Sequence, residues 1–134
     1  MNESTTNIAF LRHSLAAIRY RARKTFIDSP EGFGTLSLES DVRTPVEILS
    51  HMCDVLAFLE EKLRIDTPTS RPVYSMTWEE QQQRFDHVLS DLDRAFRSLS
   101  EIKHDTAHRL LQGPIADTLT HIGQLSMLRR CAGS

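Results

Sequence analysis

The sequence predicts an all-α protein, a four-helix bundle, and three observations lead to this fold class. Apolar residues recur at three- and four-residue steps in four separate stretches, the spacing that lines one side of an α-helix. The alternating patterns typical of strands are nearly absent, and no internal repeat is visible. Each apolar stripe needs the others for burial. A chain of 134 residues suits one core, so we expect a single domain over 1–134.

The first helix is predicted by a stripe of apolar residues that runs from Ile8 to Ala22. Thr5 or Thr6 is placed to cap it. The following stretch, "GFGTLSLES" (32–40), holds two glycines and no helical period. We expect a flexible link there, with at most a short extended piece.

Capping boxes predict where the second and third helices begin. In "TPVE", the Thr44 hydroxyl can accept from exposed backbone amides, Pro45 suits the first helical position, and Glu47 completes the box. "TWEE" repeats the pattern with Thr77 and Glu80. The stripes that follow are Ile48, Met52, Val55, Leu59 and Leu63 in one helix, and Phe85, Leu89, Leu92, Phe96 and Leu99 in the next.

Between these two helices lies a long link, "RIDTPTSRPVYSM" (64–76), which its two prolines keep from being helical. In extended form it gains about 3.3 Å per residue, enough to cross a small bundle, so the flanking helices can run parallel. Tyr74 and Trp78 suit two roles, of which anchoring this link to the bundle is preferred over lining a pocket mouth.

A fourth helix is predicted at the end of the chain, and it must either continue through Gly113 and Pro114 or begin again after them. Asp105 is a suitable cap for its start, which would leave His104 outside the helix. Pro114 must kink the helix or divide it into a short and a longer piece. Gly133 ends it.

Composition excludes several classes of function. The 16 basic and 18 acidic residues nearly balance, so neither a nucleic-acid nor a membrane partner is indicated, and the basic first helix is interpreted as a solvated face. No apolar run approaches the roughly 20 residues of a membrane span. Cys53 is expected to be buried and Cys131 exposed, without Cys-x-x-Cys spacing. We therefore expect a cytoplasmic protein.

Two polar residues interrupt the last stripe, in "DTLTHIGQ" (117–124). Asp117 and His121 are four residues apart, so their side chains lie on one face and can reach one divalent ion. His51, at the edge of the second stripe, is a candidate third ligand. This set suits Zn²⁺, Ni²⁺, Fe²⁺ or Mn²⁺ and leaves a coordination position open for water or substrate. Gly123, costly within a helix, hints at close approach by a backbone or ligand.

Other interpretations compete with this metal site. Asp and His four residues apart are common as a surface pair, and a single histidine at a core edge is more often hydrogen-bonded than a ligand. The pairs His104/His108 and His87/Asp91 have the same spacing but polar surroundings, and His13 has no evident partner. The alternative function is a metal-free helical module that binds an apolar ligand or a second copy of itself.

"TPVEILSHMCDV" (44–55) together with "LLQGPIADTLTHIGQLSMLRR" (110–130) resembles the DinB-like (DinB/YfiT-like) superfamily of small bacterial helical proteins. The resemblance implies an up-down-down-up four-helix bundle with a long crossover between helices 2 and 3. It also implies a metal site with one histidine from the second helix and a His-x-x-x-His pair from the fourth. His51 and His121 match two of these ligands, whereas Asp117 stands where the family commonly has histidine.

The resemblance implies a metal-dependent hydrolase or thiol (S-) transferase that acts on a small molecule, with a low-molecular-weight thiol as a candidate substrate, and a homodimer. A carboxylate at 117 either ligates in place of histidine or marks loss of the metal on a retained scaffold. If the second and last helices are antiparallel, His51 lies about 9 Å from the start of its helix. His121 can meet it only if the last helical rod begins near Asp105 and continues through Pro114.

Overall fold

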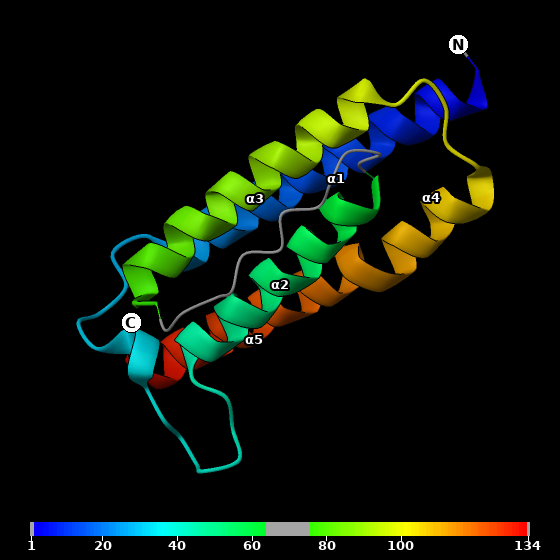
Figure 1. The fold of residues 1–134 in the computed structure, drawn as a ribbon. Helices are drawn as coiled ribbons and strands as arrows, with labels where there is room; N and C mark the ends of the chain where they lie inside the picture. Colours follow the sequence, from blue (N-terminus) through cyan, green and yellow to red (C-terminus); the bar gives the residue numbers. More distant parts are fainter. Residues whose placement is uncertain (1, 64–75, 134) are drawn as a thin grey trace.

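The computed structural model describes residues 2–63 and 76–133, which are all-helical apart from the links (Figure 1). Within these residues no strand is present. The elements are α1 (Glu3–Phe26), the 3-10 helix η1 (Phe33–Thr35), α2 (Pro45–Leu63), α3 (Trp78–Ser98), α4 (His104–Leu110), the π-helix η2 (Leu111–Ile115) and α5 (Ala116–Cys131). The prediction of a helical bundle is confirmed.

Four helical rods build the bundle, because α4, η2 and α5 follow one another without interruption (Figure 1). α2 packs mainly against α3 on one side and α5 on the other, while α1 packs against α3 and against the α4–α5 rod. All four rods contribute to one apolar core. Its most deeply buried members include Leu11, Ile18, Leu49, Met52, Leu56, Leu92, Phe96, Ile115 and Leu125.

Local interactions explain where the helices begin. Both predicted capping boxes form: the Thr44 amide donates to Glu47 over 2.9 Å, and the Thr77 amide donates to Glu80 over the same distance. The cap of α1 differs from the prediction. Its first residue is Glu3, and Asn2, not Thr5 or Thr6, supplies the capping oxygen, which accepts from the Thr5 amide at 2.8 Å. An asparagine amide oxygen caps well, and the acidic Glu3 then lies favourably in the first turn.

The first part of the link after α1, around η1, is packed, which corrects the expectation of a flexible segment there, whereas residues 37–43 are exposed. Phe33, in η1, is buried and meets the Trp78 ring edge-on with centroids 5.3 Å apart. The Trp78 indole N–H donates to the Ser29 hydroxyl at 3.0 Å, and Phe26 lies against the same indole. Trp78 therefore anchors the link between α1 and α2. Residues 64–75, with Tyr74 and most of the predicted crossover, lie outside the described residues.

Gly34 shows how closely this link is packed. A Cβ added there would lie 2.6 Å from the Trp78 Cβ, a clash that backbone movement must relieve. We expect Gly34→Ala to lower the free energy of unfolding by about 1–3 kcal/mol, measured by urea denaturation. Gly123→Ala is the control: its Cβ meets nothing within 4 Å, so a gain of up to about 1 kcal/mol from helix propensity is expected. Equal effects of the two changes would refute the packing argument.

In the part of the chain that the structure describes, no helix combines the length and the apolar character that crossing a bilayer requires.

Candidate metal centre

The candidate site forms where α2 and α5 pack side by side. His51 lies in the second turn of α2, six residues after Pro45, and the capping box fixes the start of that helix. The rod that carries Asp117 and His121 begins at His104, and it continues through Pro114 as a π-helix rather than a break. Both features match the geometry that the sequence requires for His51 and His121 to meet.

The π-helical segment explains how a helix with an internal proline stays continuous. Pro114 has no backbone N–H and cannot make the usual bond one turn back, and the wider π turn accommodates that loss. One turn later, the buried Thr118 hydroxyl donates to the Pro114 carbonyl at 2.8 Å. α5 then starts at Ala116, so Asp117 and His121 project from a regular α-helical segment.

The three predicted residues converge. One ligand-type atom from each of His51, Asp117 and His121 lies within 4.8 Å of the other two. The Asp117 Oδ2 atom is 3.6 Å from His51 Nε2 and 3.5 Å from His121 Nδ1. The two imidazole rings are 5.0 Å apart between centroids. In a tetrahedral Zn²⁺ site, two ligand atoms about 2.1 Å from the ion lie about 3.4 Å apart, and the separation of His51 Nε2 from Asp117 Oδ2 is close to this value.

A backbone contact determines the tautomer of His121. Its Nδ1 atom lies 2.7 Å from the carbonyl oxygen of Asp117. Since a carbonyl oxygen can only accept, Nδ1 must carry the hydrogen and donate. In the neutral ring the lone pair is then on Nε2, and a histidine whose other nitrogen donates to a carbonyl is the arrangement typical of metal ligands. Sequence reasoning missed this main-chain role of Asp117, although the four-residue spacing contains its signal.

Exposure differs across the three residues. The side chain of His121 is 11% exposed, whereas those of His51 and Asp117 are 39% and 42% exposed. The His121 side chain is therefore packed in the core, whereas the side chains of His51 and Asp117 are accessible to solvent. A cation here would have a protein wall on one side and access for water or a small molecule on the other.

The competing histidine pairs are arranged differently. His104 is within α4, which corrects the expectation that Asp105 caps this helix; the cap residue is Lys103, without a side-chain bond. The His104 ring lies 4.0 Å from that of His108 between centroids, and its Nδ1 is 2.8 Å from a Glu3 carboxylate oxygen. The contact with Glu3 joins α4 to α1, and Asp105 lies in the first turn of α4, where a carboxylate is favourable.

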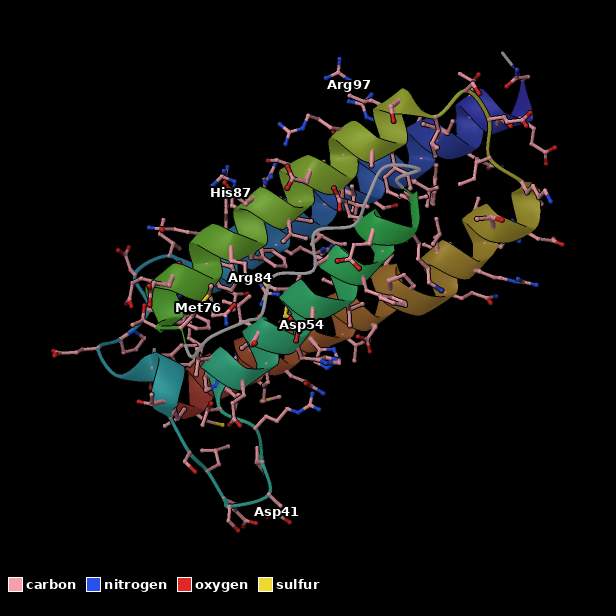
Figure 2. All side chains as sticks on the ribbon, viewed as in Figure 1. Asp41, Asp54, Met76, Arg84, His87 and Arg97 are labelled. Atoms are coloured by element: carbon pink, nitrogen blue, oxygen red, sulfur yellow. The ribbon has the colours of Figure 1, made fainter. Side chains whose placement is uncertain are left out.

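His87 points away from the bundle, as Figure 2 shows, which agrees with the prediction of a solvated residue. The Asp91 carboxylate accepts a hydrogen bond from the Arg94 guanidinium. His13 is exposed. Among the described residues, His51, Asp117 and His121 form the one cluster of three or more ligand-type side chains close enough to share an ion.

Cys53 is not available as a nucleophile near the site. Burial raises the pKa of its thiol to about 12, and its Sγ lies 3.8 Å from the Gln81 carbonyl. We expect iodoacetamide at pH 8 to modify the exposed Cys131 in the folded protein and to reach Cys53 after unfolding, because the thiolate is the reactive form. Mass spectrometry of the two cysteine peptides reads this out, and equal labelling in the folded state would contradict it.

Gly123 lies next to the site in sequence but not in space. The hint that a backbone approaches it closely is wrong, since the position of its missing Cβ is open. Residues 121 and 123 are about 200° apart around the helix, so Gly123 is on another face of α5.

Comparison of the chain with models of protein families, with curated proteins and with solved structures found no match.

Proposed function

We propose that the chain binds one divalent metal ion through His51, Asp117 and His121. The observation that carries this proposal is the convergence of two imidazoles and a carboxylate from two helices within 4.8 Å. Two neutral imidazoles and one carboxylate suit Zn²⁺, Ni²⁺, Fe²⁺ or Mn²⁺. The charge of the carboxylate offsets part of the charge of the cation, and the carbonyl of Asp117 keeps His121 in the required tautomer.

The chemistry that follows is that of an open metal site. A divalent ion would supply Lewis acidity, which favours the anionic form of water or of a low-molecular-weight thiol near neutral pH. Three protein ligands leave room for one such molecule, and the exposed sides of His51 and Asp117 give it access. We propose a hydrolase or thiol (S-) transferase acting on a small electrophilic molecule.

The same proposal includes membership of the DinB-like superfamily, the up-down-down-up order with a crossover between α2 and α3, a homodimer and a cytoplasmic location. Two observations favour the helix order. In Figure 1, α2 and α3 both start at the end of the bundle where α1 and α5 finish. His51 also meets His121 from an early turn of α2, although His121 lies 17 residues into its rod, as antiparallel packing requires.

Metal analysis tests the proposal directly. Protein purified without a metal-affinity tag, stripped with chelator and titrated with Zn²⁺, Ni²⁺ or Mn²⁺ is expected to bind about one ion per chain and to unfold at a higher temperature when loaded. If none of the three ions binds or stabilises the protein, the metal-free helical module is the better description. In that case the 3.6 Å contact between His51 and Asp117 is an ordinary ion pair.

A further inference from the structure

A cavity of about 380 Å³ lies between α1 and α5. Its lining combines four basic side chains, two hydroxyls and a small apolar surface: Arg21, Lys24, Arg129 and Arg130; Thr25 and Ser126; Leu119, Ile122 and Gly123. None of these residues is acidic. The volume lies in the range of small-molecule sites.

This cavity is separate from the candidate metal centre. Asp117 and Ser126 are nine residues apart in α5, which places them about 180° apart around the helix axis. α5 packs against α2 on the side of Asp117 and against α1 on the side of Ser126. A ligand in this cavity would therefore lie on the opposite side of α5 from the proposed metal ion.

The basic residues of α1 divide between two faces. Arg12 and Arg19 turn toward α3, where their guanidinium nitrogens lie 2.9 Å from Asp93 and 3.0 Å from Asp86. Arg21 lies about 200° around the helix from Arg19, on the face that lines the cavity. The prediction of a solvated basic face holds for the exposed Arg21, Arg23 and Lys24, whereas Arg12 and Arg19 are half-buried in ion pairs with α3.

Three of the four basic residues that line the cavity have no carboxylate partner among the residues that the structure describes. Among the described residues, no ion pair joins Arg21, Lys24 or Arg130 to an acidic side chain, and the Lys24 ammonium lies over the Tyr20 ring at 4.7 Å. Arg129 is held in place by the carbonyls of Thr25, Ile27 and Asp28, which accept from its guanidinium. Like charges gathered around one cavity repel each other, and an anion bound among them would remove that cost.

Two hydroxyl side chains and a glycine also line the cavity. The Thr25 hydroxyl donates to the Arg21 carbonyl at 3.2 Å and therefore accepts from the Ser126 hydroxyl, which is 3.0 Å away. The space beside Gly123 is free of other atoms to 4 Å. Guanidinium and ammonium donors around an open space are the groups that recognise phosphate.

We propose that this cavity binds the phosphate group of a small soluble molecule. The relevant probe is pyrophosphate, added to chelator-stripped protein at constant ionic strength so that general screening does not change. Calorimetry is expected to show one saturable site with Kd below about 1 mM. In an ¹⁵N-labelled sample the amide of Gly123 should shift and saturate, whereas that of Gly113, outside the cavity, should not.

Charge-matched variants locate the binding. The double variant Arg21→Gln/Arg130→Gln is expected to weaken pyrophosphate binding at least about tenfold, the loss typical of one charge-assisted hydrogen bond. Arg97→Gln/Arg109→Gln removes the same charge from exposed positions on α3 and α4 and should stay within about twofold of the original Kd. Figure 2 shows Arg97 directed away from the bundle.

Three outcomes would overturn the proposal: no saturation up to about 10 mM pyrophosphate, equal weakening by the two double variants, or an unshifted Gly123 amide. Vesicles of phosphatidylcholine with and without phosphatidylglycerol separate the two sources of phosphate. Sedimentation with the anionic vesicles that the Arg21→Gln/Arg130→Gln variant loses, in a protein that shows no saturable pyrophosphate binding, would assign the cavity to a lipid headgroup and refute a soluble ligand.

Discussion

Replacing His121 with alanine is expected to lower Zn²⁺ affinity by more than the roughly 10- to 100-fold that loss of an outer-shell partner costs. The ring is a proposed ligand, and its Nδ1 already donates to the Asp117 carbonyl, so the ion loses a pre-oriented Nε2. Calorimetric titration of chelator-stripped protein measures the change. The thermal stabilisation by Zn²⁺ should disappear in the same variant.

Two further variants distinguish loss of a metal ligand from damage to the core. His121 is largely buried, so its removal can also disturb the core. His51→Ala removes a more exposed ring, 39% exposed, and should cause a similar loss of affinity with a smaller effect on unfolding without metal. His87→Ala removes an exposed histidine that points away from the bundle and should bind Zn²⁺ like the original chain. Full affinity in His51→Ala would exclude the three-residue site.

The parts of the fold that sequence predicts well depend on short-range interactions. Thr44 with Glu47 and Thr77 with Glu80 form capping boxes within four residues, so their outcome does not depend on distant packing. The start of α4 differs from the prediction: His104 lies within the helix, where it contacts Glu3, which is far away in sequence. The packed link after α1 depends in the same way on Trp78, which only the tertiary fold brings to Phe33.

The two candidate sites also differ in how far the sequence predicts them. Asp117 and His121 are paired by helical spacing, and adding His51 required only that α2 and the last rod be neighbours, so the cluster was predictable. The basic cavity was not predictable in this way. Helical spacing places Arg21 and Arg19 on different faces of α1, but it does not indicate which face meets α5. Arg21 and Lys24 line one cavity with Arg129 and Arg130 only because α1 packs against α5.

Asp117 is expected to be required for its carboxylate rather than for helix structure, and three substitutions test this. Asp117→Ala should weaken Zn²⁺ binding at least about tenfold, since it removes one of three ligands and the charge that offsets the cation. Asp117→Asn keeps the shape but replaces the anion with a neutral, weaker ligand and should also lose affinity. Asp117→His supplies an imidazole at the same spacing from His121 and should retain stoichiometric binding.

The three substitutions of Asp117 can be compared directly because the contact that orients His121 is to the main chain. Its Nδ1 donates to the backbone carbonyl of residue 117, which every substitution at this position preserves. The variants therefore change the ligand set while His121 keeps its tautomer and direction. If Asp117→Ala binds Zn²⁺ as tightly as the original chain, the carboxylate is only an ion-pair partner of His51, and the three-ligand site must be abandoned. Loss in the alanine variant with recovery in Asp117→His instead identifies position 117 as a ligand, because an imidazole can replace a carboxylate in binding a cation but not in pairing with a protonated histidine.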